Sequence, residues 1–356
     1  MQISLPYQNV MLDLDSYTET LTAKHARGTP FWTKYQDKRN FRLDEIKNFD
    51  DLLQELPVFP SRILNEIDPK DVIASMYHDD SLIESISSGT TGPRKIFYWH
   101  PNEARTMQEF AAYTLNLQRF PRKEKWFGTI TTNRLLKMFL CELAITLEGD
   151  FEGIEVTDGI VSSVKKAAET KNINEMVNAY SPVVKNIVEF VQGDRTVYED
   201  ATLGLLLGGN ALQKENLNKK IKGILFGGVA TSAENLSRVR ELFPDAVIDG
   251  WYGNHFTGTM MHRHDANLSS LKYQSMFPYV TTTVRRYDNP RELVNYGERG
   301  VIVATRATEY SLLSLELGDE GTRINPIEPL MWDAISDISR IPEEKMKTLK
   351  EKLNNL

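Results

Sequence analysis

A short run of glycines and hydroxyl side chains, Ser87 to Lys95 (SSGTTGPRK), constrains this chain more than any other feature. Glycine permits positive φ values and a close backbone approach, so successive N–H groups can converge on an anion. The hydroxyls add hydrogen-bond donors, and Lys95 adds a positive charge suited to phosphate. The Gly-Lys-Ser/Thr sequence of a Walker loop is absent. We therefore expect a phosphate-binding loop of another kind, with a solvated Gly/Ser/Thr hairpin as the alternative.

The segments on either side of this run have the composition of strands. Leu82–Ile86 precedes the run and Ile96–Trp99 follows it, and both are rich in apolar or aromatic residues. We therefore expect a strand–loop–strand unit instead of the strand–loop–helix unit of a Walker loop.

Composition excludes several classes of function. The chain has 356 residues, enough for about two domains or for one large domain with subdomains. Its formal net charge of −7 argues against a nucleic-acid partner. No apolar run is long enough for a membrane span, no signal peptide is evident, and no Cys/His cluster has zinc spacing. Cys141 is the single cysteine, so an intramolecular disulfide is impossible and a cytoplasmic location is expected.

The second half of the chain alternates between strands and helices. Ile221–Phe226 is strand-like and ends in Gly227-Gly228, Ser232–Leu242 is helical, and Ala246–Asp249 is a strand before Trp251. This rhythm predicts an α/β sheet, in which ligands bind beyond the carboxyl ends of the strands. Further helices are expected at Leu43–Leu56, Asn102–Leu117 with Asn102 as N-cap, Leu135–Leu147, Thr202–Leu212 and Ile341–Leu356, with two more over Gly159–Phe190 broken at Ser181-Pro182. We divide the chain into a helical segment at 1–80, a core at 81–330 and a helical tail at 331–356.

Several motifs occur in an order that resembles the adenylate-forming superfamily, which contains acyl-CoA synthetases, peptide-synthetase adenylation domains and luciferases. The motifs are Ser87–Lys95, Gly227-Gly228-Val229-Ala230, Trp251-Tyr252-Gly253-Asn254-His255, Gly297–Thr305 and Leu317-Gly318-Asp319. Gly297–Thr305 is similar to the form found in phenylacetate-CoA ligases. The resemblance covers about residues 81–323. It implies an α/β fold, the large N-terminal domain of that superfamily, with mixed sheets flanked by helices.

The resemblance implies a role for individual residues. The implied catalytic residues are Thr90, Thr91, Lys95 and His255. The implied nucleotide-binding positions are Ser87, Ser88, Gly89, Gly92, Gly227, Gly228, Val229, Tyr252, Gly253, Asn254 and Asp319. Tyr252 would stack on the adenine, and Asp319 would accept the ribose hydroxyls. Each position also has a structural interpretation: a turn at Gly227-Gly228, a core aromatic at Tyr252, and a surface turn at Asp319.

The chain departs from the superfamily pattern in three places. Pro93 comes one position early and Arg94 takes its place. Phe256 stands where the superfamily has a glutamate that helps to hold magnesium, and phenylalanine cannot ligate a hard cation. The metal ligands are therefore not identified, and the use of Mg²⁺ beside ATP is left open. After Asp319 the chain is too short for the mobile C-terminal domain, so we expect a stand-alone large domain. In this it resembles the adenylating proteins of phenazine-antibiotic biosynthesis and the acyl-protein synthetases of bacterial luminescence.

The motifs predict a ligase that uses ATP to activate a carboxylic acid as an acyl-adenylate, with release of pyrophosphate. Phe97, Tyr98, Trp99 and Trp126 suggest an aryl acid, although core packing is the alternative for each. Coenzyme A, a carrier protein or an amine would accept the acyl group in a biosynthetic reaction. A second hypothesis is a weak nucleotide- or acyl-adenylate-binding protein whose partner supplies the missing domain. A third is acyl transfer to Cys141, although its apolar surroundings disfavour a thiolate.

Overall fold

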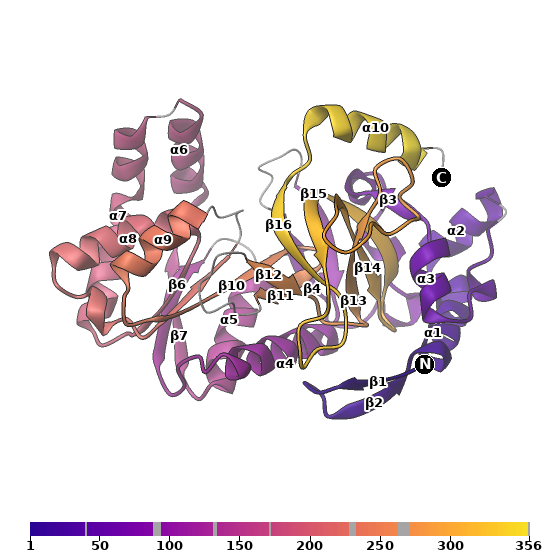
Figure 1. The fold of residues 1–356 in the computed structure, drawn as a ribbon, viewed down its shortest axis with the longest axis horizontal. Coiled ribbons are helices and arrows are strands. Elements are labelled where there is room, and N and C mark those ends of the chain that lie inside the picture. The colour runs from indigo at the N-terminus through magenta and orange to yellow at the C-terminus, as the bar shows by residue number, and fades with distance from the viewer. Residues whose placement is uncertain are drawn as a thin grey trace. The chain divides into compact units, whose positions relative to one another are not determined.

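The structure, a computed structural model, describes residues 1–39, 41–87, 94–130, 134–170, 172–227, 233–262 and 271–354. These residues form two compact units (Figure 1). Within the described chain, the first unit contains residues 1–110, 254–262 and 271–354, and the second contains residues 111–253. Each unit is described by itself below.

The first unit is built on an antiparallel sheet. Its strands follow the order β13 (Val280–Arg285), β14 (Arg299–Ala307), β15 (Leu312–Ile324), β16 (Ala334–Arg340), β12 (Lys272–Gln274) and β11 (Gly258–His262). A short strand, β3 (Val58–Pro60), adds to β15 in parallel. Helix α10 (Glu343–Asn354) closes a small apolar core by packing Leu349 and Leu353 against Val301 and Val303 of β14. The expected tail 331–356 therefore begins with a sheet strand, β16, and only then becomes helical.

The N-terminal part of this unit is a hairpin followed by helices. The hairpin is β1 (Gln2–Leu5) with β2 (Val10–Asp13), and the helices are α1 (Leu14–Gly28), α2 (Pro30–Arg39) and α3 (Phe49–Glu55), with short 3₁₀ turns η1 (Leu43–Glu45), η2 (Ser61–Asn65), η3 (Pro69–Val72) and η4 (Ser75–Tyr77). The expected helix over Leu43–Leu56 was wrong in its first part. Asn48 caps a new helix there, because its side chain accepts a 2.8 Å hydrogen bond from the amide of Asp51.

The strand–loop–strand prediction is confirmed. Strands β4 (Ile83–Ile86) and β5 (Ile96–Trp99) pair antiparallel in a two-stranded sheet. Helix α4 (Pro101–Leu117) follows directly and begins at Pro101, a residue suited to the first helical position. The expected N-cap, Asn102, therefore lies inside the helix. The carboxylate of Glu103 accepts from the amide of His100 at 2.9 Å and satisfies a donor at this helix end.

The second unit is a parallel sheet with helices, as the alternating sequence pattern predicted. The strand order is β10 (Val247–Asn254), β9 (Gly223–Phe226), β8 (Val197–Asp200), β6 (Lys125–Ile130) and β7 (Asp150–Glu155). The helices are α5 (Arg134–Thr146), α6 (Asp158–Glu169), α7 (Ile173–Gln192), α8 (Thr202–Lys214) and α9 (Ala233–Leu242), with a 3₁₀ turn η5 (Asn218–Lys220). No helix within the described ranges is both long enough and apolar enough to cross a membrane.

Two boundaries in this unit differ from the sequence prediction. The expected break at Ser181-Pro182 is wrong, because α7 continues through Pro182. The break instead precedes Asn172, whose side chain caps α7 by accepting from the amide of Glu175 at 3.2 Å. Strand β10 also does not end at Asp249 but continues to Asn254. The predicted nucleotide-binding residues Tyr252 and Gly253 are therefore strand residues.

Candidate nucleotide site

The two ends of the glycine-rich run meet across the β4–β5 hairpin. The amide of Ser87 donates to the carbonyl of Lys95 at 2.9 Å, and the amide of Lys95 donates to Oγ of Ser87 at 2.7 Å. Ser87 therefore holds the last residue of the run at the base of the loop. The predicted phosphate contacts in between lie outside the described residues: Ser88, Gly89, Thr90, Thr91 and Gly92.

The ammonium of Lys95 is oriented by its neighbours. Its Nζ donates to Oγ of Ser61 at 2.9 Å, and the side chain is partly buried. Burial lowers the pKa of Lys95, Glu316 opposes that effect, and the positive charge of Arg340 adds to it. Lys95 thus lies close to one carboxylate, that of Glu316, and to one further cation, Arg340.

Asp319 lies in the same cluster through the turn at Gly318. Gly318 has a φ of +78° within β15, a conformation that favours glycine. Its amide donates to the carboxylate of Glu316 at 2.7 Å, and burial raises the pKa of Glu316. Asp319 forms an ion pair with Arg340 at 3.2 Å. The structure therefore brings the predicted ribose ligand and the predicted phosphate lysine together around Glu316.

The Asn254–Phe256 segment is fixed by backbone contacts. Oδ1 of Asn254 accepts from the amides of Phe256 and Thr257 at 2.8 and 3.0 Å, so the asparagine shapes the turn. Nε1 of Trp99 donates to the carbonyl of His255 at 2.9 Å. Nε2 of His255 is buried and has no hydrogen-bond partner among the described residues. Burial, followed by the charge of Lys95, lowers the pKa of His255 to about 4, so the imidazole is neutral at pH 7.

Phe256 is a core residue and does not fit a metal site. Its side chain is buried and packs edge-on against Phe97 with ring centroids 5.1 Å apart. Its carbonyl accepts from Nη1 of Arg306 at 2.9 Å. Among the described residues, no three His, Cys, Asp or Glu side chains could together hold a metal ion. The residues present at this position therefore do not provide the oxygen ligands that Mg²⁺ prefers.

The second unit places Gly227, one of the predicted nucleotide-binding positions, next to Trp251. Parallel pairing of β9 with β10 brings Gly227, which follows β9, beside Trp251. A Cβ at Gly227 would collide with the indole of Trp251, so this position requires glycine for close packing. Tyr252 and Gly253 continue β10. Gly228 and Val229 lie outside the described residues. The stacking of Tyr252 on adenine stays a prediction.

The aromatic residues that suggested an aryl acid are mostly core residues. Phe97, Trp99 and Trp126 are fully buried, and Tyr98 is partly exposed. Cys141 lies on α5, where burial raises the pKa of its thiol. A raised pKa disfavours the thiolate that acyl transfer to Cys141 would need.

Sequence reasoning missed three members of the cluster around Lys95: Ser61, Glu316 and Arg340. Ser61 follows β3, which lies along β15, and Arg340 is paired with Asp319 in the register of β15 and β16. Pairing between strands that are distant in the sequence creates these contacts, and no local residue spacing predicts them. Of the three, only Glu316 lies next to a predicted motif, because it directly precedes Leu317-Gly318-Asp319.

Comparison with known proteins shows the fold. No protein-family model and no curated protein sequence matches this chain. Three solved structures of a 2-hydroxyisobutyryl-CoA ligase are similar. The open form with 2-HIB-AMP and CoA has a TM-score of 0.66 at 14% identity, covering 90% of this chain and 71% of that chain. The thioesterification state has a TM-score of 0.66 at 15% identity, covering 93% and 68%. The postadenylation state with R3-HIB-AMP has a TM-score of 0.64 at 14% identity, covering 90% and 65%.

These similarities confirm the fold that the motifs predicted. The chain has the α/β fold of adenylate-forming enzymes, over nearly its whole length. At these identities the similarity is one of fold, and it does not carry the ligase's substrates over to this chain.

Proposed function

We propose that this protein activates a carboxylic acid with ATP, forming an acyl-adenylate and releasing pyrophosphate. The observation that carries the proposal is the cluster at the base of the Ser87–Lys95 loop. It joins a cation suited to phosphate, Lys95, to a carboxylate suited to a ribose diol, Asp319. The cluster occurs in a fold shared with a ligase that was solved with an acyl-AMP.

The reaction requires alignment and charge stabilisation more than covalent chemistry. A carboxylate oxygen of the acid attacks the α-phosphorus, and the bond from that phosphorus to the bridging oxygen of pyrophosphate breaks. No proton needs to be transferred. The ammonium of Lys95 would neutralise charge that develops on the departing pyrophosphate, where preorganised donors have their largest effect. Ser61 holds the ammonium in place beforehand.

His255 would act as a neutral hydrogen-bonding group. Because its pKa is lowered to about 4, the ring carries no charge at pH 7, and its buried Nε2 is available to an oxygen of the α-phosphate or of the acid. A neutral ring can donate to one such oxygen without pairing strongly with the attacking carboxylate. Asp319, held by Arg340, would fix the ribose and thereby position the α-phosphorus for attack.

We propose an aryl acid as the substrate class and coenzyme A as the first acceptor to test. The partly exposed ring of Tyr98 supports the first choice, and the coenzyme A bound in the similar ligase supports the second. No step is assigned to magnesium, because the Phe256 position offers no ligand for it.

ATP–pyrophosphate exchange tests the proposal. A panel of aryl and aliphatic acids is assayed with and without Mg²⁺, using the native protein, Lys95→Ala, and Lys34→Ala as a surface control. We expect acid-dependent exchange that Lys95→Ala abolishes and Lys34→Ala preserves. Calorimetric binding of ATP without exchange would favour the alternative of a binding protein, for which the buried Phe256 is the supporting observation. If the protein shows no exchange and also does not bind ATP, both the ligase proposal and the binding-protein alternative are overturned.

A further inference from the structure

The first unit contains a cavity away from the Lys95–Asp319 cluster. Its volume is about 420 Å³, within the range of small-molecule sites. It is lined by residues of α1, of the first turns of α4, of the chain before β13 and of the β14–β15 hairpin. The hairpin tip and Asp319 are separated along β15 by more than about 20 Å, at roughly 3.3 Å per residue. The cavity shares no lining residue with the candidate nucleotide site.

One part of the cavity offers apolar and aromatic surface. Leu21 and Met276 line it together with Tyr17 and Tyr279, whose rings meet edge to face at 6.1 Å. The hydroxyl of Tyr17 donates to the carbonyl of Ala307 at 2.6 Å, and that of Tyr279 donates to Oε1 of Gln8 at 2.8 Å. Because both hydroxyls have partners, these tyrosines present mainly their rings to a ligand. The surface suits an apolar or aromatic body.

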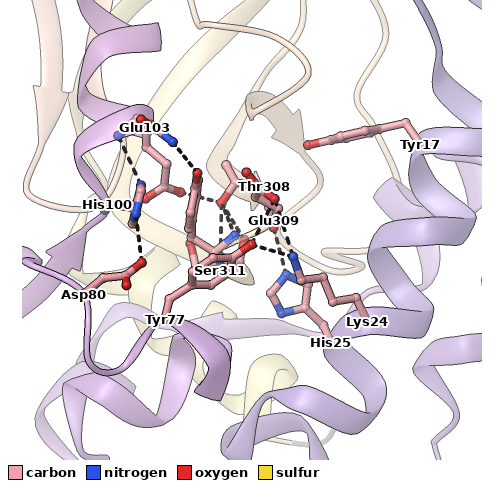
Figure 2. Close-up of polar contacts among 12 residues, drawn as sticks. Tyr17, Lys24, His25, Tyr77, Asp80, His100, Glu103, Thr308, Glu309 and Ser311 are labelled. Atoms are coloured by element: carbon pink, nitrogen blue, oxygen red, sulfur yellow. Dashed lines mark hydrogen bonds and ion pairs between the residues drawn. The ribbon is translucent and has the colours of Figure 1, made fainter.

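The other part carries two opposite charges side by side. Nζ of Lys24 lies 3.5 Å from Oε2 of Glu309, and both contact the hydroxyl of Tyr77 (Figure 2). Lys24 donates to that hydroxyl at 2.8 Å, and the hydroxyl donates to Glu309 at 3.0 Å. The side chains remain 26% and 54% exposed, respectively. An ammonium has three donors and a carboxylate about four acceptor positions, so each group can take a further partner.

The third charged residue among those that line the cavity, Glu103, is neutralised by the protein itself. Its carboxylate pairs with Arg306 at 2.7 Å and accepts from the hydroxyl of Thr308. Lys24 and Glu309 are thus the two charges that a ligand can reach. Burial alone would raise the pKa of Glu309, but hydrogen bonds from Tyr310 and Tyr77 and the charge of Lys24 lower it, so the group is ionised.

We propose that this cavity binds a small zwitterion with an apolar body, of the class of an amino acid with an aromatic or aliphatic side chain. The ligand carboxylate would pair with Lys24 and its ammonium with Glu309. In an α-amino acid these two groups flank one carbon, which matches two protein charges that are neighbours. Its side chain would lie against Leu21, Met276 and the tyrosine rings. A ligand with a single charge would gain one pairing and meet a like charge beside it.

Three probes with the same aromatic body test this charge pattern by isothermal titration calorimetry on the full chain. L-Phenylalanine carries both charges, 3-phenylpropanoate carries only the carboxylate, and 2-phenylethylamine carries only the ammonium; L-leucine tests the aliphatic case. We expect binding of one or both amino acids, with the single-charge probes weaker by about tenfold or more, the effect of one charge-assisted hydrogen bond. Absence of binding by both amino acids, or equal binding of all three aromatic probes, would overturn the proposal.

Variants locate the binding to this cavity. Lys24→Met and Glu309→Gln should each weaken amino-acid binding by about tenfold or more. Thr20→Trp places a large ring in the cavity from an exposed position of α1, so it should block binding without disturbing the core. Lys34→Met, at an exposed position of α2, is the matched control and should bind normally. Circular dichroism confirms folding, and unchanged binding by folded Thr20→Trp would overturn the assignment. Pyrophosphate exchange is measured separately, because this proposal stands or falls independently of the proposed function.

Discussion

Arg306 is a buried cation whose removal should destabilise the first unit strongly. Its side chain is fully buried, with the guanidinium 3.7 Å from the ring centroid of Trp99. Nε donates to Oγ of Ser311 at 2.8 Å and Nη1 to the carbonyl of Phe256 at 2.9 Å. Nη2 lies 2.7 Å from Oε2 of Glu103, as an ion pair without an aligned hydrogen bond. The perturbation is Arg306→Met, which keeps an apolar chain but removes every one of these polar contacts.

The magnitude follows from the charge that is left behind. Glu103 is itself buried, so in Arg306→Met its carboxylate would have no buried cation as a partner. Breaking a buried ion pair by removing one partner costs about 3–5 kcal/mol. Replacing both partners, as in Glu103→Leu/Arg306→Met, removes the unpaired charge. We therefore expect the double variant to lose clearly less than the sum of the two single variants.

Urea unfolding followed by tryptophan fluorescence measures these free energies. Arg286→Met is the matched control, because Arg286 is an exposed arginine paired with Asp288 and Glu292 at the surface. We expect no measurable loss for this control. The reasoning is refuted if Arg306→Met is as stable as the control, or if Glu103→Leu and Arg306→Met prove additive.

Three further predictions concern single positions. Lys95→Ala should slow acid-dependent pyrophosphate exchange by about a hundredfold or more, the effect of losing one preorganised donor, while circular dichroism stays unchanged. Gly318→Ala should cost about 1–2 kcal/mol in urea unfolding, because a φ of +78° is strained for any residue with a Cβ. Burial lowers the pKa of His25 to about 4. The unfolded chain then takes up a proton below about pH 6.5 and the folded chain only near pH 4, so the unfolding free energy should fall by up to about 3 kcal/mol over this window. His25→Gln should reduce that slope, which urea titrations at several pH values would show.

Composition and apolar patterning along the sequence predicted several helices and strands correctly. The apolar and aromatic flanks of the glycine-rich run form the β4–β5 hairpin as expected. The alternating pattern after Ile221 forms parallel strands with helices. The same rules failed at Pro182, because a proline inside an apolar helix is tolerated when the rest of the helix packs well, and the Asn172 cap sets the boundary instead.

The sequence predicted the motif residues of the candidate site but not the residues that contact and orient them. Lys95 and Asp319 lie in recognisable local patterns, whereas the contacts that orient them come from strand register. Pairing places Arg340 opposite Asp319 and Pro60 opposite Glu316, which brings Ser61 beside that carboxylate. Such long-range pairs have no periodicity along the chain, so one sequence cannot reveal them.

The position of Phe256 explains how this segment is held without the glutamate of the superfamily pattern. Trp99 and Arg306 bind the carbonyls of His255 and Phe256, so the backbone is fixed from the core side. A glutamate at 256 would place a carboxylate against Phe97 in a buried apolar environment, which is costly without a partner. The segment retains the neutral imidazole of His255, whose pKa is lowered first by burial and then by the charge of Lys95. If the protein activates an acid, the described residues of the loop that can bring positive charge to the phosphates are Arg94 and Lys95, since the side chain of Phe256 is no metal ligand.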